Sequence, residues 1–197
     1  MQEILPGVLH WTAIHPKTRS EASSYLVAGS GTAIDPLLPS EGIDWFDSNP
    51  VRRIVLTNRH HLRHAELLAE RFGCPILCNE AGLHEFERGP KVEGFAPGDR
   101  LADDVTALRM GAICPDDTVL HIDTAEGALA FADSLIHRGE IGFVSDRLIG
   151  DDPERVKGEV RTRVRELIAE RHFDHLLFAH GDPLVGGGKE ALRRFVG

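Results

Sequence analysis

The sequence has few of the features that mark membrane, secreted or disulfide-stabilised proteins. No apolar run approaches the roughly 18–20 residues that a membrane helix needs, and the first residues, MQEILPGVLHW, do not show the basic start and apolar stretch of a secretory signal. Cysteine is scarce: three among 197 residues, an odd number that excludes a disulfide framework. These absences predict a protein of the reducing cytoplasm with no membrane partner.

Positive charge is also in short supply. The chain has 22 Lys and Arg against 31 Asp and Glu, which gives a net charge of −9. A nucleic-acid backbone repels such a surface unless a local basic patch overcomes the balance. The densest basic cluster, around Arg161, Arg163 and Arg165, is interleaved with Glu159 and Glu166, as on a solvated helix face. We therefore expect no nucleic-acid partner.

What the chain does have is enough apolar sequence for one continuous core. Its 197 residues are 42% hydrophobic, and this length is typical of a single domain. No linker or repeat divides them, so residues 1–197 are expected to form one domain. With no partner domain and an acidic surface, we expect a monomer or a small homo-oligomer.

Short apolar runs alternate with turn formers and with longer helical segments, which predicts an α/β protein. Strands are expected at 24–28, 32–34, 53–57, 75–78, 105–109, 118–122, 128–132 and 175–179. Helices are expected over about 62–72, along a buried stripe that runs from Val156 to Ile168, and over 189–196. Both halves thus contain strands followed by a helix and a strand. Two packed sheets with helices outside would bury all these apolar faces.

Three of the eleven histidines lie within five residues, directly after the expected strand 53–57. They are His60, His61 and His64. Imidazole commonly binds zinc, iron or manganese, and a spacing of three or four residues places two rings on one helix face. The alternative is that these are polar residues of an exposed loop between strand and helix.

Two further strand ends carry groups that can bind a metal. Asp133 follows the strand 128–132, where it could ligate a metal or cap the next segment. His180 follows the strand 175–179, where it could ligate a metal or hydrogen-bond the turn at Gly181 to Pro183. Because ligands usually bind at strand ends in α/β folds, the three strand ends together indicate one site.

Four segments occur in an order that resembles the metallo-β-lactamase superfamily: SYLVAGSGTAIDP, RIVLTNRHHLRHAELLAERFGCPILC, GALAFADSL and LLFAHGDP. The resemblance runs from about residue 23 to 184. It implies an α/β fold, the αββα four-layer sandwich of two mixed sheets, with one or two metals between the sheet edges. It also implies a metal-dependent hydrolase acting on a small ester, thioester or phosphoester.

The family's first metal motif, T-H-x-H-x-D-H, is only partly retained. Aligned on Thr57, it places Asn58 at the first His, His60 at the second, Leu62 at the Asp and Arg63 at the last His. Only His60 is then a family ligand, and Asn58 is left in a supporting role.

A shift of the same motif by one residue gives a second alignment. His61 and His64 then occupy the second and last His positions, while Arg59 and Arg63 occupy the other two. Both alignments remain open at the level of the sequence.

The later motifs are retained in part. The family's next His would fall on Ile113 or Cys114, neither of which replaces it. The bridging Asp corresponds to Asp133 and the final His to His180, and the Asp of an I-D-P strand end corresponds to Asp35, which usually supports the metal loop. Too few ligands remain for two metals, and we expect one divalent zinc, iron or manganese ion, or none.

The ligand set drawn from these alignments is His60, His61, His64, Asp133 and His180, with Asp133 and His64 as catalytic groups. Arg59 and Arg63 would repel a second cation and contact substrate. The alternative is a metal-free, non-catalytic relative in which Arg59 and Arg63 pair with Asp133 or bind an anionic small molecule.

Overall fold

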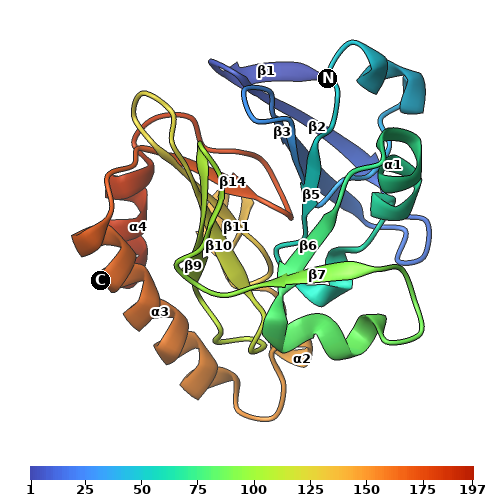
Figure 1. The fold of residues 1–197 in the computed structure, drawn as a ribbon. Helices are drawn as coiled ribbons and strands as arrows, with labels where there is room; N and C mark the ends of the chain where they lie inside the picture. The colour runs from blue at the N-terminus through green and yellow to red at the C-terminus, as the bar shows by residue number, and fades with distance from the viewer.

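The computed structural model describes residues 1–197. Two β-sheets face each other, with helix α1 on the outside of one and helices α3 and α4 on the outside of the other (Figure 1). The expected αββα sandwich is therefore confirmed.

The first sheet has seven strands in chain order. Its first four strands are antiparallel, and β4 to β7 are parallel. The strands are β1 (Gln2–Leu5), β2 (Val8–Ile14), β3 (Glu21–Val27), β4 (Thr32–Ile34), β5 (Arg53–Val55), β6 (Ile76–Asn79) and β7 (Val92–Phe95).

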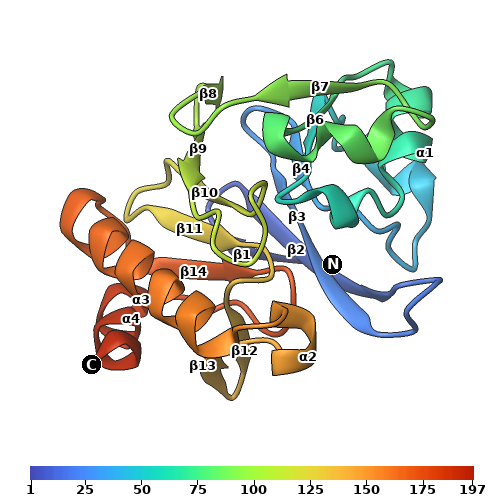
Figure 2. The same ribbon diagram turned by 90° about the horizontal axis from the view of Figure 1, so that it is seen from below.

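The second sheet has five strands in the order β14-β11-β10-β9-β8, and only β11 and β14 are parallel. A two-stranded hairpin, β12–β13, lies beside α2 (Figure 2). The strands are β8 (Arg100–Ala102), β9 (Val105–Arg109), β10 (Thr118–Ile122), β11 (Ala128–Phe131), β12 (Ile136–Arg138), β13 (Glu140–Gly142) and β14 (His175–Phe178).

The helices begin and end at residues suited to those positions. Helix α1 (Ala65–Phe72) ends at Gly73, whose φ of 63° is the left-handed conformation that favours glycine. Helix α3 (Pro153–Glu170) starts with a proline, and the Asp152 side chain caps it by accepting a hydrogen bond from the Arg155 amide. The others are α2 (Asp146–Ile149), α4 (Gly188–Val196) and the 3-10 helices Ile43–Asp47, Arg59–His61 and Glu80–Phe86.

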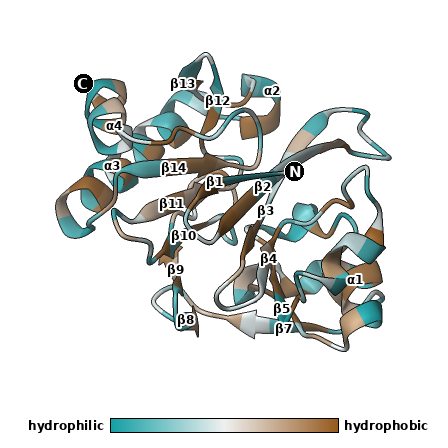
Figure 3. Ribbon diagram, turned by 90° about the horizontal axis from the view of Figure 1, so that it is seen from above, coloured by the Kyte–Doolittle hydropathy of each residue, from teal (hydrophilic) through white to brown (hydrophobic).

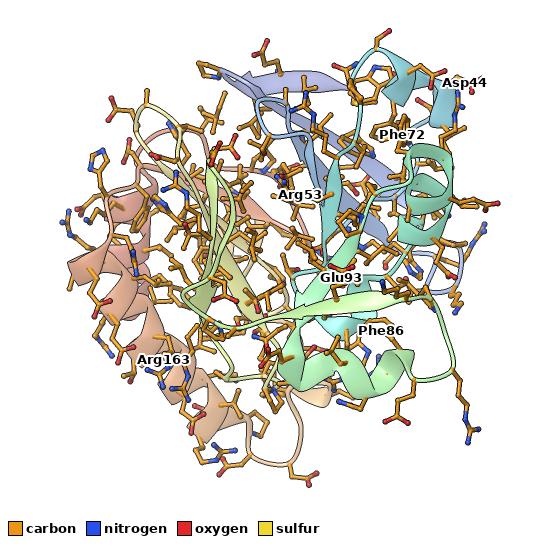
Figure 4. The ribbon with its side chains drawn as sticks, viewed as in Figure 1. Asp44, Arg53, Phe72, Phe86, Glu93 and Arg163 are labelled. Carbon is orange, nitrogen blue, oxygen red and sulfur yellow. The ribbon has the colours of Figure 1, made fainter.

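Three buried clusters correspond to the three interfaces between the four layers. One cluster, which includes Tyr25 and Leu120, draws on strands of both sheets and fills the space between them. Another packs the second sheet under α3 and α4, and the third packs the first sheet under α1. The helices alternate polar and apolar colouring along their length (Figure 3). Phe72 and Arg163 lie on opposite sides of the sandwich (Figure 4).

Most expected elements are confirmed, and the strands at 105–109 and 118–122 have the expected bounds. One boundary matters for function: the helix expected from residue 62 starts only at Ala65, and a 3-10 helix occupies Arg59–His61. The amino-terminal strands, β7, β8 and the β12–β13 hairpin were not expected. None of the helices is both long enough and apolar enough to cross a membrane.

Candidate functional site

Two site residues are brought together by the register of two parallel strands. Phe131 in β11 is paired with Phe178 in β14, and each strand is followed, two residues after this pair, by a polar side chain. These side chains are Asp133 and His180, and the His180 Nε2 lies 3.1 Å from the Asp133 Oδ1. Adjacent parallel strands that end at the same level therefore place the carboxylate beside the imidazole.

The turn after His180 requires glycine. Gly181 has a φ of 102°, and a Cβ there would collide with the backbone of His137 in β12. The His137 amide donates to the His180 carbonyl at 3.2 Å, and the Asp182 amide donates to the His137 carbonyl at 2.9 Å. The β12 strand thus holds the turn that carries His180.

His61 reaches the same place from the first sheet. It ends the 3-10 helix that follows β5, and the Asn58 side chain caps that helix by accepting from the His60 amide at 2.9 Å. The His61 Nε2 lies 3.5 Å from the Asp133 Oδ1, and its ring meets that of His180 edge to face at 5.5 Å between centroids.

A buried carboxylate, Asp35, fixes the orientation of the His61 ring. Asp35 Oδ2 is 2.9 Å from the His61 Nδ1, and Asp35 Oδ1 accepts from the Thr57 amide at 2.8 Å. With Nδ1 held there, the Nε2 of His61 faces Asp133. Asn58 holds the other side of the site, because its Nδ2 donates to the Asp133 Oδ2 at 2.8 Å.

The site is an alternating row of charges. Burial by itself would lower the pKa of His61, but Asp35 and Asp133 outweigh it and raise that pKa to about 9. Burial by itself would raise the pKa values of Asp35 and Asp133. The nearby His61 nevertheless holds both pKa values below their usual range, and His180 further lowers the pKa of Asp133. At neutral pH a protonated His61 therefore lies between two carboxylates.

Three donor atoms, one each from His61, Asp133 and His180, lie within 4.8 Å of one another. Asp133 and His180 also line a cleft of about 510 Å³. The other residues around this cleft are Ser20, Arg59, His60, Ile113, Cys114, Ile136, Arg138, Val144, Ser145 and Leu148. Two imidazoles and a carboxylate that converge beside a cleft are a donor set that can hold a metal ion.

The remaining two histidines of the cluster lie outside this group of donors. His60 is exposed and lines the cleft. The structure departs from the expectation for His64, whose Nδ1 accepts a hydrogen bond from the Leu38 amide at 2.9 Å. His64 is the residue just before helix α1, but its side chain makes no capping hydrogen bond to that helix. The expected spacing on one helix face does not apply, because the helix begins only after His64.

The two arginines also differ from the expectation that they face Asp133 or a bound anion. Arg59 forms an ion pair with the buried Asp116, which also accepts from the Arg59 amide at 2.7 Å. Arg63 donates to the backbone carbonyls of Ser23 and Asp35, each at 2.7 Å, and does not line the cleft. Both side chains are held by partners inside the protein, and Arg59 is the one of the two that also lines the cleft.

Sequence reasoning missed the residues on the far wall of the cleft and the acids beneath it. Ile136, Arg138 and Leu148 belong to the β12–β13 hairpin and α2, which carry no motif. Asp116 and its neighbour Asp117 are both buried. Burial, together with nearby Asp133, raises the pKa of Asp117 to about 8 although Ser134 bonds to it. In the sequence, the sign of this buried pair is two adjacent acids, Asp116 and Asp117, just before the expected strand 118–122.

No family model matches the sequence, and no curated protein matches it. Solved structures do match. The metallo-β-lactamase TMB-1 has a TM-score of 0.73 at 14% identity, covering 99% of this chain and 95% of its own. TTHA1623, solved in a di-iron-bound form, has a TM-score of 0.68 at 20% identity, covering 92% of this chain and 96% of its own.

A third likeness comes from an archaeon. ST1585 from Sulfolobus tokodaii, a metallo-β-lactamase superfamily protein, has a TM-score of 0.67 at 14% identity, covering 96% of this chain and 84% of its own. At such identities, these likenesses establish the fold.

Proposed function

Because the chain has the metallo-β-lactamase fold, we propose that it is a hydrolase in which His61, Asp133 and His180 hold one divalent metal ion. The substrate is a small molecule with an ester, thioester or phosphoester bond. The observation that carries the proposal is the convergence of these three side chains, from both sheets, at a point where two of them, Asp133 and His180, line the cleft.

The donor set fits a catalytic metal. Three protein ligands leave a coordination position open for water or substrate, whereas structural sites use four. The second nitrogen of His61 is already bonded to Asp35, the usual arrangement for a metal-binding histidine, and it leaves Nε2 as the ligand atom. Two imidazoles and one carboxylate suit zinc, iron or manganese.

The chemistry divides between the ion and the chain. When bound, the metal supplies a Lewis acid that polarises the scissile bond and makes water nucleophilic near neutral pH. In the overall reaction, water oxygen bonds to the acyl carbon or phosphorus, the bond to the leaving oxygen or sulfur breaks, and a proton from water ends on the leaving group. Asp133 remains an anion across neutral pH, and Asn58 holds its Oδ2 in place.

The contacts favour this function over a metal-free anion site built from Arg59 and Arg63. Arg59 is neutralised by Asp116, and Arg63 is bound to backbone carbonyls away from the cleft. Neither residue therefore brings an unbalanced positive charge into the cleft.

The test is metal binding followed by hydrolysis. Purified protein without a histidine tag is titrated with zinc, ferrous iron and manganese, then assayed with 4-nitrophenyl esters, a thioester and a phosphoester. We expect one equivalent of metal, and hydrolysis that Asp133→Ala and His180→Ala both abolish.

His84→Ala is the matched control, because His84 is an exposed histidine bonded only to the Ala81 carbonyl. It should leave binding and hydrolysis unchanged. A chain that binds none of the three metals, or that binds one equally well without Asp133 and His180, would overturn the proposal.

A further inference from the structure

The cleft is lined by charged side chains and by an apolar wall, and the two come from different elements of the chain. Asp133 and His180 follow β11 and β14 of the second sheet. Ile136, Val144 and Leu148 come from residues 136–149, which contain β12, β13 and α2. The β12–β13 pair is separate from the two main sheets and lies beside α2 (Figures 2 and 3).

The apolar side of the cleft is exposed to solvent. Leu148 is 63% exposed, which is the highest exposed fraction of any large hydrophobic side chain in the protein. A single exposed leucine is ordinary, but this one lines the same cleft as Ile113, Ile136 and Val144. Several apolar side chains around a cleft with a few polar groups are typical of a small-molecule site.

Two arginines line the cleft, and only one of them is free. Arg59 is paired with the buried Asp116. Arg138, exposed at the end of β12, makes no ion pair, and its side chain makes no hydrogen bond within the protein. Arg138 is therefore the permanent positive charge of the cleft that no carboxylate of the protein neutralises.

We propose that the substrate is an amphipathic anion. Its scissile bond lies at His61, Asp133 and His180, its apolar segment packs against Leu148 and its neighbours, and a distal carboxylate pairs with Arg138. This inference rests on the proposed hydrolase function and adds the substrate class. The free cation and the apolar wall in one cleft carry it.

The size of the cleft limits the substrate. Its volume of about 510 Å³ lies within the range of small-ligand pockets, roughly 300–1,000 Å³, and is too small to enclose a polymer. A ligand of this size has room for an anionic group that pairs with Arg138, a short apolar chain and a hydrolysable bond.

The test compares the monomethyl esters of straight-chain dicarboxylic acids of about four to eight carbons with the same esters in which a primary amide replaces the free carboxylate, so that the two ligands of a pair have the same length and differ in the distal charge. Binding to the metal-free protein is measured by calorimetry in chelator, which prevents hydrolysis. We expect the best charged ester to bind about fivefold more tightly than its amide counterpart, as a partly exposed ion pair allows. Arg138→Gln should remove this preference, whereas the control Arg155→Gln, on α3, should keep it.

Leucine variants test the apolar wall separately. Leu148→Ser should weaken both ligands by about fivefold, and the control Leu67→Ser, an exposed leucine on α1, should change neither. Equal affinities for the two ligands in the unmodified protein, or a preference that survives Arg138→Gln, would overturn the inference.

The same pairs, prepared as 4-nitrophenyl esters, separate this inference from the function it rests on. Hydrolysis of charged and neutral esters with equal kcat/KM, unaffected by Arg138→Gln, leaves the hydrolase intact and removes the anionic substrate. If Arg138→Gln abolishes the binding preference but the protein hydrolyses neither ester, the hydrolase proposal is wrong and the anionic ligand class is supported.

Discussion

The two halves of the candidate site are built in different ways. In the second sheet, Asp133 and His180 follow adjacent parallel strands, and both side chains reach the cleft. In the first sheet, the loop 57–64 supplies three histidines and two arginines, but only His61 joins the group of donors. The side chains of Arg59, Arg63 and His64 are held by Asp116, by backbone carbonyls and by the Leu38 amide.

The difference shows which residues a sequence motif can place in space. Asp133 and His180 each lie two residues after a hydrogen-bonded pair of parallel strands, and the register of that pair places the two side chains next to each other. The direction of a side chain in a 3-10 turn depends on a few backbone dihedral angles. If the turn or the following helix starts one residue earlier or later, the same side chain points to a different place. Strand-end ligands are therefore easier to assign than ligands in the following loop.

The largest effect is expected from removing the shared carboxylate. Asp133→Ala should weaken zinc binding at least about 1,000-fold, equivalent to about 4 kcal/mol, because losing a ligand costs more than the 10–100-fold of an outer contact. His60→Ala should change the affinity less than about threefold, within the scatter of surface substitutions. Competition with a chelating dye measures both, and similar losses in the two variants would contradict the assignment.

The next largest effect concerns the residue that holds the loop half of the site. Asp35→Asn should lower the free energy of unfolding of the metal-free protein by about 3 kcal/mol, because it removes the nearer of the two carboxylates that pair with buried His61. Urea unfolding at pH 6.5 in chelator measures this. Asp47→Asn, which breaks the exposed Asp47–Arg71 pair, should cost at most about 1 kcal/mol. Equal costs would show that Asp35 is not the anchor.

A smaller effect should appear as pH dependence. The pKa of His61 is raised to about 9 in the folded chain, against about 6.5 when unfolded. The stabilisation from its charge is therefore complete below pH 6.5 and is lost as the pH rises through about 9. Between pH 6.5 and 8.5 the stability advantage of the metal-free protein over His61→Gln should shrink by about 2 kcal/mol.

Urea unfolding of both proteins in chelator at pH 6.5, 7.5 and 8.5 follows this advantage. A constant difference would mean that His61 is not protonated between the two carboxylates.

The smallest effect is expected at His64, the residue just before helix α1. His64→Ala should cost about 1 kcal/mol of stability, because it leaves the Leu38 amide without its acceptor. The zinc affinity should stay within about threefold of the unmodified protein, because the His64 ring lies outside the donor group. A loss of zinc binding comparable to that of His180→Ala would reverse the comparison between the two halves of the site.

Much of the fold could be predicted because its strands and helices have strong local patterns. The runs at 105–109 and 118–122 match β9 and β10, and Gly73 ends α1 as expected. The amino-terminal strands were missed because their residues alternate less clearly, and the β12–β13 hairpin has only three residues in each strand. Short strands are defined by the partners they pair with, and a local pattern does not identify those partners.

The sequence alone predicted two packed sheets with helices outside and placed Asp133 and His180 at strand ends, because periodic burial and strand ends are local properties. The resemblance to a known family added the four-layer sandwich. Only the tertiary structure decided that His61 joins these two strand-end residues, that Arg63 and His64 do not, and that Arg138 and Leu148 line the same cleft. Those outcomes depend on contacts between residues far apart in the chain, such as Asp35 with His61 and Arg59 with Asp116. A buried charge is stable only beside its partner, and that partner is supplied by the fold.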